Sequence, residues 1–295
     1  MIITSLFISA FLLFSSFFQK YNTANPDFGE TNSLRIMTFN IRYDNPYDEE
    51  NSWNFRKDKV LSVIRFYDCD IIGLQEALIH QLEYLADSLK AYKWTGVGRD
   101  DGNSGGEFSP IFYKAKRFKL LNTNTFWLSP TPEIPGSKGW DAAITKIVTW
   151  AKFEDIKTKD AVFTFNTHFD HLGVDARINS SKILLERINL ITNGNYFIIT
   201  GDFNFTGDSE PYKILTGSDI VKVNDAAKYS VSPVHGPAWT FHGFKENTEN
   251  PKIDYIFVGK NIIVLKHGVL TDNWSGRYPS DHLPVFSEII LQQIK

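Results

Sequence analysis

The sequence predicts an α/β domain in which one sheet packs on another and helices lie outside. Short apolar or alternating runs, typical of strands, recur from residue 34 to the C-terminus. Between some of them, leucine and isoleucine recur at the three- and four-residue spacing of amphipathic helices. The chain is 42% hydrophobic and 15% aromatic, which is enough apolar material for a sizeable core. Strands and helices mixed in this way are typical of layered α/β domains.

The expected strands begin with residues 34–40, which alternate apolar and polar side chains as a half-buried strand does. Residues 70–74 form a second run and read as a buried strand. Further runs of the same kind predict strands at 109–113, 146–153, 161–167, 196–200, 253–258 and 285–291.

Apolar stripes predict three helices between these strands. Asn193-Gly194 ends the last of them, because both residues favour the left-handed conformation that terminates a helix. The stripes are Val60, Ile64 and Tyr67; Leu78, Leu82, Leu85 and Leu89; and Leu184, Leu185, Ile188 and Ile191.

The N-terminus reads as a separate segment. Residues 2–18 are mostly apolar and uncharged, and the length suits a signal-peptide core or a short membrane anchor. The polar residues 19–33 read as a linker. We therefore expect residues 1–25 to be a signal peptide or N-terminal anchor with linker, and residues 34–295 to be one domain. Export would place the protein in the periplasm, in the cell envelope or outside the cell, and an uncleaved anchor would associate it with the membrane.

The overall charge bears on whether the protein binds nucleic acid. The net charge is −3 and the pI is about 6.2, which argues against a strongly basic clamp for nucleic acid. Cys69 is the single cysteine, so an internal disulfide is excluded, and its apolar surroundings predict a small buried thiol.

Polar side chains collect where the expected strands begin or end. Such side chains converge on one cleft when the strand ends meet at one edge, where α/β proteins commonly bind ligands. Carboxylate and carboxamide oxygens suit a hard divalent cation, and a nearby histidine can transfer a proton. The segments are Phe39-Asn40, Leu74-Gln75-Glu76, Thr167-His168, Gly201-Asp202-Phe203-Asn204, Ile253-Asp254-Tyr255 and Ser280-Asp281-His282.

These six segments, in this order, resemble the endonuclease/exonuclease/phosphatase superfamily. It includes pancreatic-type deoxyribonucleases, abasic-site endonucleases, neutral sphingomyelinases, inositol-polyphosphate 5-phosphatases and deadenylases. The resemblance covers essentially all of residues 34–295. It implies a catalytic domain with a four-layer α/β sandwich, in which two central, mostly antiparallel or mixed sheets are flanked by helices. It also implies hydrolysis of a phosphate ester that depends on Mg²⁺ or Mn²⁺.

The resemblance also implies a role for each matching residue. Glu76 would be the main metal ligand, with Asn40 and Asp281 completing the metal shell. His282 would transfer a proton or steady the phosphate, and Asp254 would accept a hydrogen bond from its other nitrogen.

The remaining matching residues would face the phosphate and the water. His168 would donate to a phosphate oxygen, Asn204 would hold the phosphate, and Asp202 would orient the attacking water or take its proton. The division of the base role between Asp202 and His282 stays open.

Glu107 follows the glycine-rich loop 102–106 and either pairs with His168, as in relatives, or is a solvated loop acid.

Other polar residues near these motifs have two open interpretations each. They either face the substrate or serve ordinary turns, helix starts and structural contacts. They are Arg99, Asp100, Asp101, Asp170, Arg177 and His242.

Three functions remain open at this point. The first is an exported, metal-dependent phosphoesterase that acts, as a monomer, on a small or lipid-linked phosphate ester. The second is a secreted nuclease acting on DNA or RNA. The third is a non-catalytic binding module with the same fold, although the complete set of matching residues argues against it.

Overall fold

The computed structural model describes residues 32–245 and 250–292. Ser33–Lys295 form one compact unit. The expected signal peptide or anchor at residues 1–25 lies outside the described residues. Within the described ranges, none of the helices combines the length and apolar character needed to cross a membrane.

Two six-stranded sheets form the centre of the domain. The strands of the first sheet, in spatial order, are β11 (Ile262–Val269), β12 (Val285–Leu291), β1 (Leu34–Asn40), β2 (Ile71–Gln75), β4 (Ile111–Lys114) and β3 (Tyr92–Thr95). Those of the second are β5 (Phe118–Trp127), β6 (Ile147–Asp155), β7 (Ala161–His168), β8 (Tyr196–Asp202), β10 (Asp254–Gly259) and β9 (Val223–Asp225). The pairs β1–β2 and β7–β8 are parallel and the other pairs are antiparallel, so both sheets are mixed.

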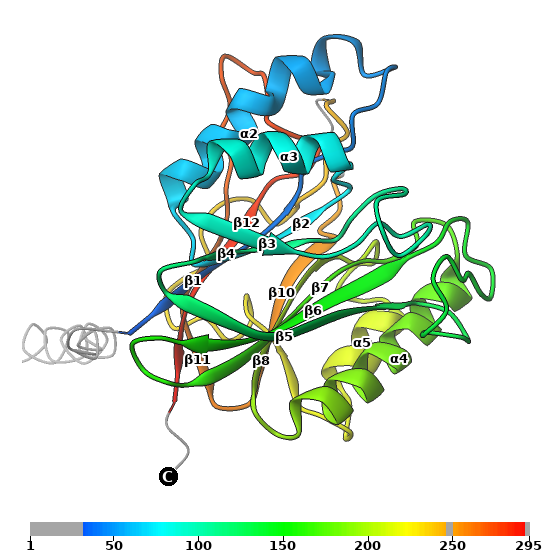
Figure 1. Cartoon of the computed structure of the whole chain (residues 1–295), viewed down its shortest axis with the longest axis vertical. Coiled ribbons are helices and arrows are strands. Elements are labelled where there is room, and N and C mark those ends of the chain that lie inside the picture. The colour runs from blue at the N-terminus through cyan, green and yellow to red at the C-terminus, as the bar shows by residue number, and fades with distance from the viewer. Residues whose placement is uncertain (1–31, 246–249, 293–295) are drawn as a thin grey trace, which may run out of the picture. The chain divides into compact units, whose positions relative to one another are not determined.

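Helices cover the outer face of each sheet (Figure 1). The first sheet carries α2 (Trp53–Tyr67) and α3 (Ile79–Ser88), and a short 3₁₀ turn, η1 (Glu49–Asn51), precedes α2. The second sheet carries α4 (Val174–Thr192) and α5 (Glu210–Thr216). The order helix, sheet, sheet, helix confirms the predicted four-layer α/β sandwich.

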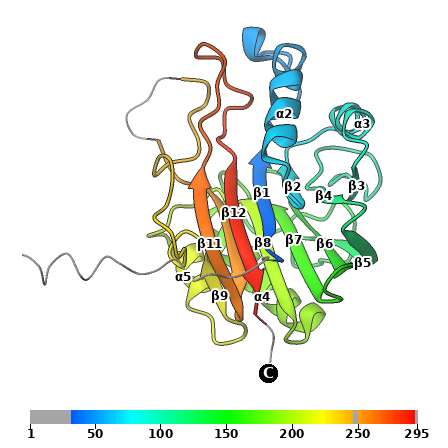
Figure 2. The ribbon, with the colours of Figure 1, turned by 90° about the vertical axis from the view of Figure 1, so that its left-hand side faces the viewer.

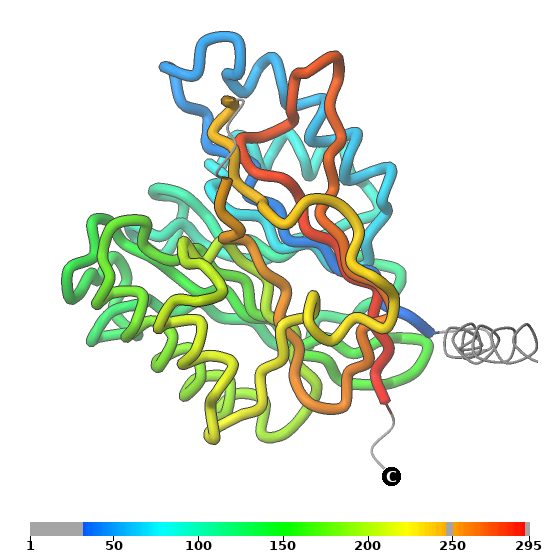
Figure 3. Tube along the Cα trace, turned by 180° about the vertical axis from the view of Figure 1, so that it is seen from behind, coloured from blue at the N-terminus to red at the C-terminus, as the bar shows by residue number. Residues whose placement is uncertain are grey.

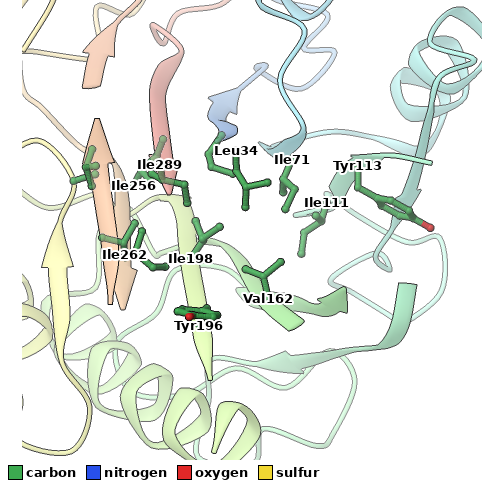
Figure 4. Close-up of a cluster of buried hydrophobic side chains, with 14 of the residues drawn as sticks. Leu34, Ile71, Ile111, Tyr113, Val162, Tyr196, Ile198, Ile256, Ile262 and Ile289 are labelled. Carbon is green, nitrogen blue, oxygen red and sulfur yellow. The ribbon is translucent and has the colours of Figure 1, made fainter. Parts of the chain in front are cut away.

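A buried apolar cluster fills the space between the sheets (Figure 4). Leu34, Ile71 and Ile111 come from the first sheet and meet Val162 and Ile198 of the second. All five side chains are fully excluded from solvent. Burying a side chain of this size contributes about 1.5–3 kcal/mol, so this interface holds the two sheets at a fixed spacing.

The strand directions bring the polar motifs to one edge of both sheets. The two parallel pairs end together, with Asn40 opposite Gln75 and His168 opposite Asp202. The antiparallel neighbours begin at that edge: Asp254, the first residue of β10, pairs with Asp202. Strand β12 runs antiparallel to β1, from the opposite end of the chain (Figures 2 and 3). The residues just before β12 therefore reach the same edge.

All the strands and helices expected from the sequence are present, with ends shifted by a few residues. The chain also contains elements that the hydrophobic pattern does not predict, namely β3, β5, β9, β11 and α5. Cys69 is buried and free, as predicted.

Candidate functional site

The shared edge of the two sheets opens into a cleft of about 470 Å³. Most of the predicted site residues line it, and Asn40 and Asp254 lie directly behind, bonded to residues that do. The lining residues are Arg42, Tyr43, Glu76, Arg99, Glu107, Ile144, Lys146, His168, His171, Asp202, Asn204, Phe241, Ile253, Asp281 and His282.

Asn40 connects the carboxylates of the two sheets. Its Nδ2 donates to Glu76 Oε1 at 3.0 Å and to Asp202 Oδ2 at 2.9 Å, while its own oxygen accepts from the backbone N–H of Arg42 at 3.0 Å. Burial opposes ionisation of Glu76, but the positive charge of His282 and the hydrogen bond from Asn40 offset it and lower its pKa. Glu76 is therefore an ionised carboxylate facing the cleft.

The donor atoms of the site fit a divalent metal ion. Glu76, His168 and Asp202 each offer one atom, and these atoms lie within 4.8 Å of one another. A second set with the same spacing joins Asp202 to Asp254 and His282, but His282 Nδ1 is already hydrogen-bonded to Asp254, so these two residues serve each other and not a metal. Carboxylate oxygens are the donors that Mg²⁺ and Mn²⁺ prefer in proteins, so Glu76 and Asp202 suit such an ion. Asp281 lies on the same side and accepts from Ser280 Oγ at 3.2 Å.

His282 and the carboxylates of Asp254 and Asp202 form a buried, closely spaced group. Its Nδ1 donates to Asp254 Oδ2 at 2.9 Å, and its Nε2 lies 3.7 Å from Asp202 Oδ2. Burial disfavours the charged ring, but the carboxylates of Asp254 and Asp202 outweigh it and raise the pKa of His282 to about 10. Burial and the charge of Asp254 raise the pKa of Asp202 to about 7. The imidazole is thus held as a cation beside a carboxyl group that titrates near neutrality.

His168 is held in the opposite charge state. Asn204 Nδ2 donates to His168 Nε2 at 3.1 Å and to the Phe169 carbonyl at 3.0 Å. Burial lowers the pKa of His168, and the nearby cations Lys146 and Arg99 lower it further. A neutral ring that accepts at Nε2 keeps its proton on Nδ1, so the site contains one neutral and one charged imidazole.

Glu107 binds Arg99 rather than His168. Its Oε2 accepts from Arg99 Nη1 at 2.5 Å, whereas His168 Nδ1 lies 3.9 Å away, beyond hydrogen-bond range. Burial and the charge of Glu76 raise the pKa of Glu107. Glu107 is a half-buried member of the cleft wall, with its side chain 15% exposed and bound to Arg99, so it is not a solvated loop acid. The expected partner of Glu107 was His168, but the structure gives it Arg99 as a partner.

Arg42 and Lys146 line the cleft, although the motif pattern gives neither a role. Arg42 binds Asp48 through two hydrogen bonds of 2.9 and 3.0 Å and lies 3.8 Å from Asp281. Lys146 is 4% exposed and directly precedes β6. Arg42 lies two residues after Asn40, and Lys146 lies at the start of a strand, so their positions could have suggested a place in the site. The sequence does not favour that interpretation, because most lysine and arginine side chains are exposed.

The residues with open interpretations divide between the cleft and local structure. Arg99 lines the cleft. Asp101 Oδ1 accepts from the backbone N–H groups of Asn103 and Gly105, which makes it a turn residue. Asp170 likewise accepts from Leu172 and Gly173 in the turn before α4.

The other residues in this group serve local packing. Arg177 donates to the Asp170 carbonyl at 2.9 Å as α4 begins. His242 is buried, with its ring centroid 4.4 Å from that of Tyr278, and its neighbour Phe241 takes the place on the cleft wall.

A polar network beneath the cleft ties the sheets together. Gln75 Nε2 donates to Asn166 Oδ1 at 2.6 Å, and Thr200 Oγ1 donates to the same oxygen at 3.0 Å. Asn166 Nδ2 donates to the Leu74 carbonyl at 2.7 Å. Gly73 lies against this network, because a Cβ there would sit 2.1 Å from Thr200 Oγ1. Asn166 thus points between the sheets and does not line the cleft.

Three site residues adopt left-handed backbone conformations that non-glycine residues rarely take. They are Arg42 with φ 56°, Glu76 with φ 62° and Asn204 with φ 50°. Each follows the end of a strand by one or two residues, so the chain turns sharply there and aims the side chain into the cleft. Such conformations cost roughly 1–3 kcal/mol each and cluster at functional sites.

Comparisons with known proteins give a matching family model and similar solved structures. The sequence model described as the Endonuclease/Exonuclease/phosphatase family matches residues 37–282. A solved endonuclease/exonuclease/phosphatase from Bacteroides vulgatus is 39% identical, with a TM-score of 0.85, over 88% of this chain and 99% of that one. A mannosyl-6-phosphatase from Bacteroides thetaiotaomicron is 33% identical, with a TM-score of 0.82, over 87% of this chain and 99% of that one.

Curated sequences give a more distant match. A CCR4-Not complex 3′-5′-exoribonuclease subunit from Neosartorya fischeri is 24% identical over 58% of this chain. The chain spans between 26% and 50% of the length of the curated relatives that it matches.

Proposed function

Because the chain belongs to the endonuclease/exonuclease/phosphatase family, whose members hydrolyse phosphate esters, we propose that it is a metal-dependent phosphomonoesterase acting on a sugar phosphate. The observation that carries the proposal is the charge arrangement of the cleft. Ionised Glu76 with Asp202 offers oxygen donors on one side, while a charged His282 and a neutral His168 face the same space. The 33% identity with a mannosyl-6-phosphatase over nearly the full domain supports a sugar phosphate as the substrate.

The residues of the cleft suit in-line attack of water on phosphorus. Glu76, with Asn40 and Asp281 beside it, would hold Mg²⁺ or Mn²⁺, which stabilises the charge that develops on the phosphate oxygens. Asp202, with a pKa near 7, can accept the proton of the attacking water.

The other groups hold the substrate and the leaving group. The imidazolium of His282 can donate a hydrogen bond or a proton from Nε2, because Asp254 occupies Nδ1. Asn204 and His168 line the same cleft and would contact the phosphoryl group.

A nuclease is the second candidate, and the exoribonuclease relative favours it. The net charge of −3 argues against it, because sequence-independent binding of nucleic acid relies on clusters of lysine and arginine. Two of the arginines in the cleft are already occupied by carboxylates, Arg42 by Asp48 and Arg99 by Glu107. We therefore rank a small phosphomonoester above a polynucleotide.

We also propose that the protein is exported, on the basis of the apolar N-terminal segment, and acts as a monomer. Cell fractionation and N-terminal sequencing of the purified protein test export and cleavage. A protein found in the cytoplasm with an intact first residue would contradict the proposal. Light scattering of the purified chain tests the monomeric state.

The test of the proposed activity is hydrolysis by the purified full-length chain after removal of metal and re-addition of Mg²⁺ or Mn²⁺, followed as phosphate release from the monoesters, p-nitrophenol release from the diester and shortening of the polynucleotide. The substrates are mannose 6-phosphate, glucose 6-phosphate, bis(p-nitrophenyl) phosphate and polyadenylate, with His282→Ala alongside. We expect metal-dependent release from a sugar phosphate that falls by a factor of about 10² or more in the variant. Cleavage of polyadenylate alone would favour the nuclease, and turnover by His282→Ala at the normal rate would reject the mechanism.

A further inference from the structure

Lys146 is a buried cation that no described residue neutralises by direct contact. Its side chain lines the cleft, and the residue is 4% exposed. Within residues 32–245 and 250–292, its Nζ has neither a hydrogen bond nor an ion pair. Burying an ammonium group without a partner is unfavourable, so a side chain kept in this state calls for an explanation in terms of a ligand or of its neighbours.

The other cations on the described cleft wall are already bound. Asp48 binds the Arg42 guanidinium through two hydrogen bonds, and Glu107 binds Arg99. The ring of His168 is held neutral. Among the described lysine and arginine residues that line the cleft, Lys146 is therefore the one whose charged group has no hydrogen bond to a carboxylate.

The surroundings of Lys146 identify the charge of that ligand. Burial lowers the pKa of Lys146 and Arg99 lowers it further, while the carboxylates of Glu107, Asp202 and Glu76 oppose this from a distance, so an anionic group close to Nζ would stabilise the charged form. These residues lie around the cleft of about 470 Å³, whereas the separate hollow beside Lys146 measures only about 10 Å³ and has no room for a phosphate. A ligand that satisfies Nζ must therefore enter from the cleft and present an anionic oxygen.

We propose that Lys146 binds a non-bridging oxygen of the substrate's phosphoryl group and favours the dianion of a phosphomonoester over the monoanion of a diester. Lysine is a compact point charge with three donors on a flexible stem, which suits a terminal phosphate oxygen. Glu76 and Asp202 lie across the same cleft, so the phosphoryl group would lie between the metal side and Lys146. This role rests on the proposed phosphomonoesterase function and extends it to the charge of the substrate.

Equilibrium binding of inorganic phosphate tests the role of Lys146 without relying on turnover. Titration calorimetry with the full-length chain in Mg²⁺ gives the affinity, and the phosphate-induced rise in melting temperature gives a second readout. The variants are Lys146→Met, which keeps the length of the side chain and removes the charge, and Lys146→Arg, which keeps the charge. Lys119→Met, at an exposed position on β5, is the matched control.

We expect Lys146→Met to weaken phosphate binding about tenfold or more, which is the size of a lost charge-assisted hydrogen bond. Lys146→Arg should retain most of the affinity, and Lys119→Met all of it. In turnover, Lys146→Met should lose more kcat/KM on a phosphomonoester than on a diester.

Two results would overturn the assignment. One is a folded Lys146→Met protein with the affinity and phosphate-induced stabilisation of the wild type, which would make the lysine a purely structural charge. The other is an equal loss of kcat/KM on both ester types. Phosphate binding that depends on Lys146 in a protein without turnover would support the site and reject the phosphomonoesterase, so the two proposals fail separately.

Discussion

Replacing Asp254 by asparagine should lower the pKa of His282 more than any other single change in the cleft. Asp254 Oδ2 accepts the Nδ1 proton of His282 at 2.9 Å, and both residues are buried. Asparagine is close in size and can still accept that hydrogen bond, but it carries no charge. The substitution therefore removes the charge of the pair while leaving the hydrogen bond in place.

The structure sets the expected size of the effect. The pKa of His282 is raised from 6.5 to about 10 against the effect of burial, and Asp254 is the strongest of the raising causes. That difference corresponds to roughly 5 kcal/mol in favour of the imidazolium, because one pKa unit is about 1.4 kcal/mol. Removing the Asp254 charge should bring the pKa of His282 down by two units or more, and the pKa of Asp202 should fall with it, since Asp254 also raises that value.

Side-chain NMR titration of the metal-free protein measures this directly through the imidazole ¹⁵N shifts of His282. The matched control is Asp225→Asn, a buried carboxylate that accepts from Tyr212 and does not contact His282. In turnover, the pH at which activity falls on the alkaline side should move down in Asp254→Asn and stay in the control. A His282 pKa unchanged in Asp254→Asn would refute the electrostatic account of the pair.

Three further outcomes follow from the packing. Gly73→Ala should lower the free energy of unfolding in urea by roughly 1–3 kcal/mol, because the new Cβ would lie 2.1 Å from Thr200 Oγ1. The control is Gly207→Ala, where the nearest atom to the new Cβ is 3.8 Å away, and it should leave the free energy of unfolding nearly unchanged. Burial lowers the pKa of His267 to about 4, so the unfolded chain takes up the proton first, and stability present above pH 6.5 is lost between pH 6.5 and 4. That loss is roughly 3 kcal/mol of unfolding free energy. It should be absent when the stability of His267→Asn is measured by urea unfolding across this pH range, and a variant with the same pH dependence as the wild type would contradict the prediction. The buried Arg56 guanidinium donates to backbone carbonyls of the loop after β1. Arg56→Lys should therefore lower the free energy of unfolding by roughly 2 kcal/mol or more and weaken Mn²⁺ binding measured by calorimetry. An unchanged Mn²⁺ affinity would show that the loop keeps its conformation without the guanidinium.

The part of the fold that the sequence predicts is its interior. The central strands and the longer helices bury an apolar face, and that burial is what the hydrophobic pattern records. Every strand that the pattern misses, β3, β5, β9 and β11, lies at an edge of its sheet. Strands β3 and β9 have only four and three residues, and β5 carries the polar run Asn122-Thr123-Asn124, as expected of edge strands that meet solvent; β11 is apolar and long enough to have been predicted. Helix α5 has only seven residues, too few for a stripe to stand out.

The site divides in a similar way. Residues with a fixed place in the backbone, such as Asn40 and Asp202 at strand ends, were predictable because strand direction brings those ends together. The partners of long side chains were not predictable. Glu107 binds Arg99 across a loop, a contact that depends on how residues 98–107 fold back. Lys146 has the sequence character of a surface lysine, and only the packing around it shows that it is buried.

The two sheets contribute different halves of the chemistry, so their spacing is itself part of the site. Glu76 and Asn40 belong to the first sheet, and Asp202 and His168 belong to the second. A single asparagine, Asn40, bonds the carboxylates of both, and the network of Gln75, Asn166 and Thr200 fixes the separation one layer below.

A shift of one sheet against the other would lengthen these bonds together and move the cleft residues of one sheet relative to those of the other. This explains why a glycine with no room for a methyl group lies in the strand that leads to Glu76: the close approach of the sheets at Gly73 sets the width of the cleft above. Gly73→Ala should therefore reduce kcat as well as stability, although Gly73 does not line the cleft, because misplacement of reacting groups by about 1 Å can cost a factor of about 10².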